Sequence, residues 1–207
     1  MASRYLAQLT KMRESPLGLA WSEGWYRYAR ALPSPNFGVR PVNADIDLLV
    51  IHSISLPPGE FGNDNVQRLF TNQLDWDAHP YFQSIRNLQV SAHFFICRAG
   101  RLWQFVSCER RAWHAGQSLH LGREDCNHYS IGIELEGSEG GHFEPLQYET
   151  LAALCAAILS KYPVRHVAGH EHVAVGRKFD PGPGFDWQRL GRSLGLASQS
   201  LPDGVPK

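Results

Sequence analysis

Three side chains have the types and positions that a catalytic metal site requires. His52 ends an apolar run, His170 directly follows another, and Asp180 lies in the Gly/Pro-rich segment beyond. Zinc in hydrolases commonly takes three protein ligands of nitrogen, oxygen or sulfur type and leaves a fourth position for water. Two histidines and one carboxylate therefore form a candidate zinc set, in which His166 and His172 remain alternative ligands.

A carboxylate near these residues could carry protons. Glu134 lies on a strand face that otherwise contains Ser130 and Gly132, which predicts open space in front of it. A glutamate facing a metal can take a proton from water and pass it to a leaving nitrogen. Glu136 lies on the same face, and the pattern alone does not distinguish the two.

A lysine could stabilise charge at the same site. Lys178 precedes Asp180 by two residues, so it lies close to the metal if Asp180 is a ligand. A fixed ammonium there could stabilise the negative oxygen that forms when water attacks a carbonyl. The alternative is a solvated loop lysine.

The elements that must position these groups follow strand and helix patterns. Residues 46–53, IDLLVIHS, form an apolar run typical of a strand covered on both faces. The pattern predicts a helix within residues 63–74, with Val66, Leu69 and Phe70 on one side. Residues 90–98 and 101–107 predict an antiparallel hairpin.

The second half of the chain has the same mixed character. In the strand at residues 129–137, the alternation places Ile131, Ile133 and Leu135 in the core. A helix follows at residues 145–162, and a short strand at 164–169 leads to His170. We therefore expect an α/β fold with a central mixed β-sheet flanked by helices.

Length and charge limit the classes of protein. A chain of 207 residues favours a single domain, residues 1–207, with a core at about 22–193. We expect residues 1–21 to form an N-terminal extension and 195–207 a flexible tail. Zero formal net charge and no apolar run of about 20 residues indicate neither a nucleic-acid nor a membrane partner, and we expect a monomer.

The cysteines and the N-terminus favour a cytoplasmic protein. The four cysteines are scattered singly, without a pattern typical of a disulfide framework, and Cys155 falls on an apolar helix stripe as a core residue. Lys11, Arg13 and Glu14 interrupt the region where a secretory signal needs an apolar core.

Several long motifs, in order from about Pro33 to Trp187, resemble those of the AmpD amidases. They are PSPNF, LLVIHSISLPPGEFG, AHPYF, VSAHFFICRAG, RAWHAGQS, GREDCN, YSIGIELEG and GRKFDPGPGFDW. These amidases are cytoplasmic enzymes of bacterial cell-wall recycling, within the wider zinc amidase family that includes T7 lysozyme and the peptidoglycan recognition proteins. The resemblance implies the peptidoglycan-recognition-protein-like fold of that family.

The resemblance also implies roles for individual residues. His52, His170 and Asp180 match the zinc ligands of the family, and the first glutamate of GIELEG, Glu134, matches its catalytic residue. Lys178 matches the lysine near the scissile carbonyl. Residues that would bind the substrate are not assigned. The motif residues His93 and His114 are interpreted as wall or core, and Trp113 and Phe61 as either substrate walls or core.

The implied substrate is the N-acetylmuramoyl-L-alanine linkage, preferably in 1,6-anhydro-muropeptides. The sequence departs from the family pattern at Ser53, where asparagine is frequent, and in the run between His170 and Asp180. These departures remove no proposed ligand, but they can alter the hydrogen bonds around the metal. The alternative function is a non-catalytic muropeptide-binding or sensing module, which commonly lacks a zinc ligand.

Overall fold

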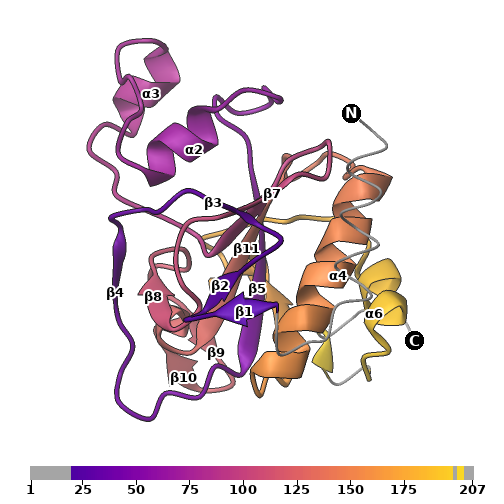
Figure 1. Ribbon diagram of the computed structural model, residues 1–207. Coiled ribbons are helices and arrows are strands. Elements are labelled where there is room, and N and C mark those ends of the chain that lie inside the picture. The colour runs from indigo at the N-terminus through magenta and orange to yellow at the C-terminus, as the bar shows by residue number, and fades with distance from the viewer. Residues whose placement is uncertain (1–19, 198–199, 203–207) are drawn as a thin grey trace.

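A six-stranded mixed sheet lies at the centre of the protein (Figure 1), whose computed structural model describes residues 20–197 and 200–202. The strand order is β12 (His166–Gly169), β5 (Leu48–Ile54), β11 (Ser130–Glu136), β6 (Phe94–Ile96), β7 (Leu102–Gln104) and β3 (Arg30–Ala31). The first four are parallel, β7 is antiparallel to β6, and β3 is parallel to β7. The predicted mixed sheet and its hairpin are confirmed.

Shorter elements surround this sheet. Three antiparallel pairs join β1 (Trp21–Ser22) to β2 (Trp25–Tyr26), β4 (Phe37–Val39) to β8 (Arg110–Ala112), and β9 (Leu119–His120) to β10 (Arg123–Glu124). A 3-10 turn, η2 (Cys126–His128), precedes β11. Strands of two or three residues are too short to show the alternation on which sequence prediction depends.

Helices cover one face of the sheet. The predicted helix is α4 (Pro145–Lys161), and α6 (Trp187–Leu194) packs beside it (Figure 1). Leu151, Leu154, Cys155 and Ile158 of α4 are buried in one cluster with the side chains that β5 and β11 direct to this face. The core positions predicted for residues 129–137 and for Cys155 therefore all lie in the largest cluster of the hydrophobic core.

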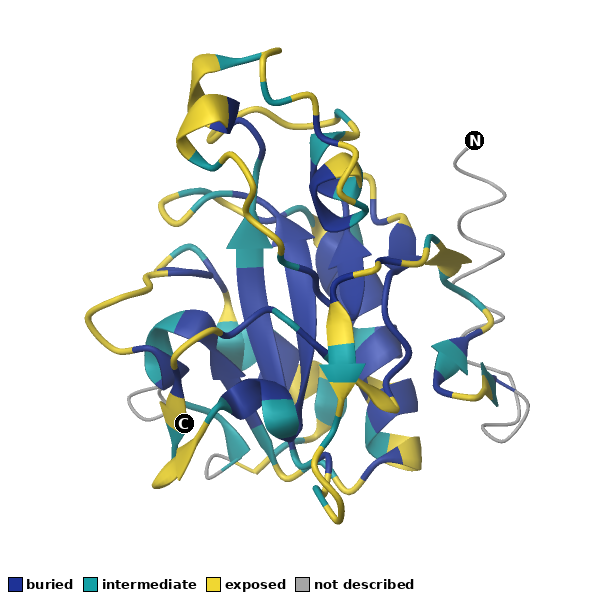
Figure 2. Ribbon diagram, turned by 90° about the vertical axis from the view of Figure 1, so that its left-hand side faces the viewer, coloured by how far each residue is buried: buried dark blue, intermediate teal, exposed yellow. Residues whose placement is uncertain are grey.

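The opposite face of the sheet carries the chemistry. Here β5 and β11 present Leu48, Val50 and small residues, and the coil around Ala115, η2 and the one-turn helix α5 (His170–Val173) cover them. Figure 2 shows the central strands buried along most of their length. Coil on this face, instead of a long helix, allows polar side chains to approach the strands closely.

A separate hydrophobic cluster supports the segment beyond the carboxyl end of β5. It contains α2 (Asn65–Phe70), whose Val66, Leu69 and Phe70 are buried as predicted, and Phe82 of α3 (Pro80–Ser84). These helices lie at the top of the molecule in Figure 1, beyond the sheet. They form a shoulder beside the ends of the parallel strands.

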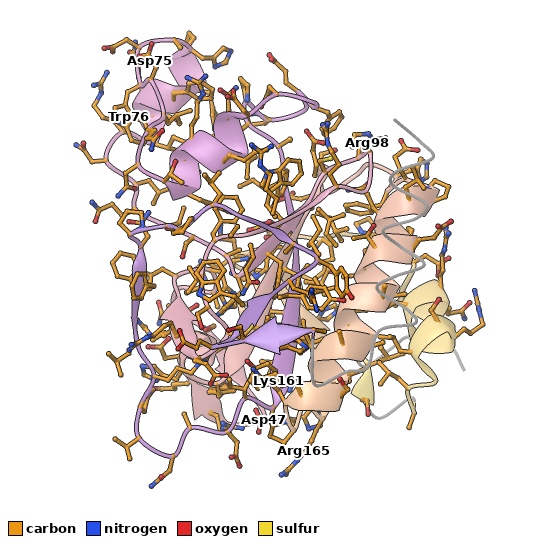
Figure 3. The ribbon with its side chains drawn as sticks, in the orientation of Figure 1. Asp47, Asp75, Trp76, Arg98, Lys161 and Arg165 are labelled. Atoms are coloured by element: carbon orange, nitrogen blue, oxygen red, sulfur yellow. The ribbon has the colours of Figure 1, made fainter. Side chains whose placement is uncertain are left out.

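The edge strand β12 is aligned on β5 at the lower end of the sheet. The carbonyl oxygen of Asp47 accepts hydrogen bonds from the backbone N–H groups of Arg165 and His166, at 2.8 and 3.1 Å. Asp47 and Arg165 are labelled close together there in Figure 3. This register determines the position of His170, the residue after β12, relative to the residues of β5.

The ends of the chain contact the domain where they are described. Residues 1–19 of the expected extension and residues 198–199 and 203–207 of the expected tail lie outside the described residues. Ala20 and Trp21 belong to the core region, and Leu196 and Leu201 pack against the main core cluster. Within the described residues, no helix is both long and apolar enough to cross a membrane.

Candidate metal centre and catalytic cleft

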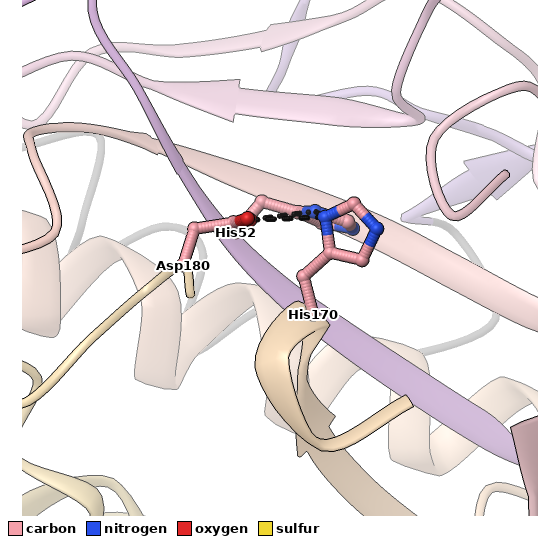
Figure 4. A group of neighbouring side chains, drawn as sticks. All are labelled: His52, His170 and Asp180. Atoms are coloured by element: carbon pink, nitrogen blue, oxygen red, sulfur yellow. Dashed lines mark hydrogen bonds and ion pairs between the residues drawn. The ribbon is translucent and has the colours of Figure 1, made fainter. Parts of the chain in front are cut away.

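The candidate ligands converge on one point from three segments of the chain. Nδ1 of His52 lies 3.0 Å from Nδ1 of His170 and 3.1 Å from Oδ2 of Asp180, and the last two atoms are 3.1 Å apart (Figure 4). A tetrahedral zinc ion with ligand bonds of about 2.1 Å separates its ligands by roughly 3.4 Å. The three atoms therefore have the chemistry and spacing of one face of a zinc tetrahedron, and they form the only such group found among the described residues.

The register of the parallel strands brings the two histidines to one level. His52 on β5 is paired with Glu134 on β11, so both side chains lie on the same face of the sheet. On the other side, Gly169 of β12 is paired with Ile51, and His170 is the next residue. The three groups thus lie at the carboxyl ends of adjacent parallel strands, where α/β sheets commonly bind ligands.

The third candidate ligand comes from the loop after α5. The backbone N–H of Glu171 donates to the carbonyl of Asp180 at 2.8 Å, which fixes Asp180 beside His170. Further along this loop, Gly182 has φ of +80° and lies so close to Glu139 that an added Cβ would be 2.1 Å from its carbonyl oxygen. Only glycine fits this position, which locks the loop onto the segment after β11.

Burial and mutual proximity shift the pKa values of these ligands. Burial, followed by the neighbouring His170, lowers the pKa of His52 to about 4 against the attraction of Asp180. Burial alone would raise the pKa of Asp180, but hydrogen bonds with His170 and His52 outweigh it and hold this pKa well below its usual range. At neutral pH the site therefore combines a neutral His52 with a carboxylate, the forms in which these groups bind metal.

The Nε2 atoms of His52 and His170, which point away from the three converging donor atoms, also have hydrogen-bond partners. Nε2 of His170 lies 3.0 Å from the carbonyl oxygen of Ala115, and Nε2 of His52 lies 3.0 Å from Nδ1 of His114. His114 is 9% exposed and lies 62 residues from His52 in the sequence. Its interpretation as wall or core captured its burial but not its contact with a candidate ligand.

The two glutamates of β11 have different surroundings. Glu136 is buried, and its carboxylate accepts hydrogen bonds from the backbone N–H groups of Gly62 and Arg98. Glu134 is also buried, but its Oε2 has no hydrogen-bond partner. Glu136 therefore joins segments of the fold, whereas Glu134 has an oxygen free to bind another molecule.

Glu134 faces the cleft with a shifted pKa. Its burial, and then the negative charge of Asp180, raise its pKa well above the usual value, although Lys178 acts in the opposite direction. Glu134 lines the cleft, so the expected open space in front of it is present, whereas the space over Gly132 on the same strand face is filled by the ring of His114. A carboxyl with a raised pKa in a cleft is suited to take up and return a proton.

One cleft of about 580 Å³ connects these groups. Its polar end contains the three candidate ligands, Glu134 and Lys178, and its other walls come from the shoulder around α2 and α3, with Tyr81 and Leu88 partly exposed. Lys178 is exposed beside the ligand loop. The structure thus brings together all five residues that the sequence singled out.

The remaining histidines are separate from the metal point. His166 lies at the beginning of β12, paired with Leu48, at the opposite end of the strand from His170. Nδ1 of His172 accepts a hydrogen bond from the backbone N–H of Gly169, and its ring packs on Trp187. Neither belongs to the group of converging donors, so the geometry favours His52 and His170 over both alternatives.

The two aromatic candidates differ in position. Trp113 lines the cleft, so it is a wall residue. Phe61 is 40% exposed, is absent from the cleft lining, and lies under the guanidinium of Arg98 at 4.7 Å. It is therefore neither core nor a wall of this cleft.

Comparisons with known proteins identify the family to which this chain is similar. The N-acetylmuramoyl-L-alanine amidase family model matches residues 42–183. The 1,6-anhydro-N-acetylmuramyl-L-alanine amidase AmpD of Citrobacter freundii is 50% identical over 170 residues, which cover 81% of this chain and 91% of that enzyme. The corresponding AmpD of Escherichia coli is 48% identical, with 81% and 93% covered.

Solved structures show the same fold. A selenomethionine derivative of AmpD superposes with a TM-score of 0.82 at 48% identity, covering 84% of this chain and 98% of that one. The amidase AmiD of Escherichia coli, in complex with anhydro-N-acetylmuramic acid-L-Ala-D-γ-Glu-L-Lys, superposes with a TM-score of 0.55 at 30% identity. That match covers 77% of this chain and 62% of AmiD.

Proposed function

Because this chain belongs to the N-acetylmuramoyl-L-alanine amidase family, we propose that it hydrolyses the amide bond between N-acetylmuramic acid and L-alanine, preferably in 1,6-anhydro-muropeptides. The observation that carries the proposal is the convergence of His52, His170 and Asp180 beside the unpaired carboxyl oxygen of Glu134. A binding or sensing module has no need for this combination of metal donors and a proton-carrying group.

The proposed cofactor is one zinc ion, held by Nδ1 of His52, Nδ1 of His170 and Oδ2 of Asp180. The donor set of two imidazoles and one carboxylate, with one position left for water, is typical of catalytic zinc sites. When bound, zinc would supply a Lewis acid that polarises a carbonyl and lowers the pKa of water.

Glu134 and Lys178 would carry out the remaining chemistry. Glu134 takes a proton from the attacking water and returns it to the nitrogen of L-alanine, so that the amine leaves in neutral form. The ammonium of Lys178, at the rim of the cleft, stabilises the negative charge on the former carbonyl oxygen. The products are the free peptide and the lactyl carboxylate of the sugar.

The relatives suggest where the reaction takes place. The AmpD proteins to which this chain is similar are named for a 1,6-anhydro-muramyl substrate. We accordingly place this protein in the cytoplasm, as a monomer that acts in peptidoglycan recycling.

Product analysis tests the proposal directly. Zinc-loaded protein is incubated with two matched muramyl tripeptides, one 1,6-anhydro and one reducing, and the products are identified by mass spectrometry. We expect free tripeptide mainly from the anhydro substrate. Equal cleavage would indicate a broader amidase, and binding without cleavage would replace the proposal with the sensing module.

A further inference from the structure

The coil segment His114–Ala115 lies behind both histidine ligands. Nδ1 of His114 lies 3.0 Å from the outer nitrogen of His52, and the carbonyl oxygen of Ala115 lies 3.0 Å from the outer nitrogen of His170. Two consecutive residues therefore contact both ligands on the side away from the metal point.

The segment is itself firmly anchored. The side-chain oxygen of Asn127, which is buried, accepts hydrogen bonds from the backbone N–H groups of His114 at 3.1 Å and Ala115 at 2.8 Å. The guanidinium of Arg177 donates to the carbonyl of Ala115 at 2.6 Å. The position of both outer partners is thus determined by contacts that do not involve the ligands.

The hydrogen-bond chemistry gives each ligand one tautomer. A backbone carbonyl can only accept, so Nε2 of His170 carries the proton and its Nδ1 presents a lone pair to the metal. A neutral His52 with its Nδ1 lone pair on the metal must likewise donate from Nε2, which requires an acceptor at Nδ1 of His114. His114 then carries its proton on Nε2, which lies 3.2 Å from the hydroxyl oxygen of Ser130.

Strand β11 has small residues where the ring of His114 packs against it. Above Gly132, where a side chain would otherwise stand, lies the ring of His114, and a Cβ there would be 2.5 Å from Cγ of the ring. Ser130, the partner of the outer nitrogen, is the residue two positions earlier on the same strand face. The small residues Ser130 and Gly132 of β11 therefore leave the space that the ring of His114 occupies.

We propose that His114–Ala115 is the positioning element of the metal site, which fixes the tautomer and orientation of both histidine ligands, with His114 acting on His52 through an acceptor nitrogen. The proposal rests on the proposed metal site and adds to it two residues that are not among the candidate ligands. Hydrogen bonds of this kind to ligand histidines typically change metal affinity by about 10- to 100-fold.

Zinc affinity, measured by chelator competition on the full chain, tests the role of His114. His114→Leu removes the acceptor, and we expect its zinc affinity to fall about 10- to 100-fold. His114→Asn restores an acceptor close to the position of Nδ1, and we expect it to recover most of the loss. Equal affinity in His114→Leu and wild type, or no recovery in His114→Asn, would overturn the proposal.

A matched control separates positioning from general damage to the core. Gln104 on β7 is a fully buried polar side chain that accepts from Tyr26 and donates to Gly24. It does not line the cleft, and β7 is separated from β11 by β6. Gln104→Leu should lower the thermal unfolding temperature without changing zinc affinity. An equal loss of affinity in Gln104→Leu would show that any core damage weakens the site, and the proposal would fail.

A milder variant keeps the test decisive if His114→Leu does not fold. Gly132→Ala leaves every hydrogen-bonding group in place but displaces the His114 ring, so zinc affinity should fall. The control is Gly38→Ala on β4, where an added Cβ meets its nearest atom at 3.8 Å, an ordinary contact. Unchanged zinc affinity in Gly132→Ala would contradict the proposal.

Long-range proton–nitrogen NMR of the zinc-loaded wild type reads the tautomers directly. We expect the proton on Nε2 in His52, His114 and His170; a proton on Nδ1 of His114 would overturn the proposal. Failure of the wild type itself to bind zinc would instead refute the proposed function, so the two failures are distinguishable.

Discussion

At the scale of single residues, the site depends on the contrast between carboxyl groups that have partners and one that does not. Asp180 is held between two histidines, and Glu136 between two backbone N–H groups, whereas Oε2 of Glu134 has no partner. A buried unpaired oxygen costs about 1–3 kcal/mol, a cost that is tolerated where a substrate or water uses the group.

The Glu134→Gln variant should keep its zinc and lose turnover. Because a glutamine cannot take up and return a proton, we expect kcat to fall about 100- to 10,000-fold. Metal content by atomic absorption and kcat on the anhydro-muramyl tripeptide measure the two effects. Turnover near the wild-type rate would remove Glu134 from the mechanism.

Asp180→Ala should show the opposite behaviour. Removing one of three ligands leaves two histidines, so we expect the purified variant to contain little zinc and to be inactive. The same metal analysis checks this outcome. A zinc-replete and active variant would mean that the third ligand is a different residue.

Lys178→Met should reduce turnover without affecting the fold. Lys178 is exposed, so loss of its charge costs little stability, but loss of a group that stabilises the oxyanion typically costs about 100- to 1000-fold in kcat. Steady-state kinetics and thermal unfolding together test this expectation. A change in KM alone would assign Lys178 to substrate binding instead.

At the scale of elements, β11 carries two glutamates that affect stability in different ways. Glu136 joins the strand to the loop at Gly62 and to the β6–β7 turn at Arg98. We expect Glu136→Ala to lower the free energy of unfolding by about 2–4 kcal/mol, because two hydrogen bonds to a charged group are lost and two N–H groups lose their acceptor. Urea unfolding of the metal-free protein measures the change.

Glu134→Ala is the matched control on the same strand face. Its carboxyl contributes no hydrogen bond through Oε2 and is costly to ionise, so its removal should leave stability unchanged or slightly increased. Comparable destabilisation by both variants would contradict the division of roles. The same element would thus contribute to the fold at one position and to the chemistry two residues away.

At the scale of the whole molecule, the buried histidines make stability depend on pH. Burial, and then the neighbouring His170, lowers the pKa of His52 to about 4. Burial, and then the positive charge of Arg40, lowers the pKa of His93 to about 3. Burial and neighbouring histidines hold the pKa of His114 well below its usual value. Each of these groups resists protonation in the folded state but accepts a proton near pH 6.5 in the unfolded state.

The metal-free protein should therefore lose stability as the pH falls from about 6.5 towards 4. In this range the unfolded state binds more protons than the folded state, so the free energy of unfolding decreases by about 1.4 kcal/mol per pH unit for each such histidine. Urea unfolding at several pH values, with a chelator present, measures this slope. A flat profile between pH 6.5 and 4.5 would show that these histidines do not remain neutral.

Much of the fold and part of the site were predictable from the sequence. The apolar run ending at His52, the alternation of β11 and the helical spacing of α4 are local patterns, and local patterns determine secondary structure and the face on which a side chain lies. The order of the family motifs then singled out five candidate residues, all of which line one cleft. Short strands such as β9 and β10 were not predictable, because two residues do not form a pattern.

Tertiary structure alone decided which residues act together. Periodicity places Glu134 and Glu136 on one face of the strand. It does not reveal that the carboxylate of Glu136 accepts hydrogen bonds from the backbone N–H groups of Gly62 and Arg98, whereas Oε2 of Glu134 has no partner. Similarly, His114 lies 62 residues from His52 in the sequence, and its ring contacts His52 while packing over Gly132, which the strand pattern does not reveal. The physical reason is that a strand determines where its side chains point, whereas the segments that pack against them come from distant parts of the chain.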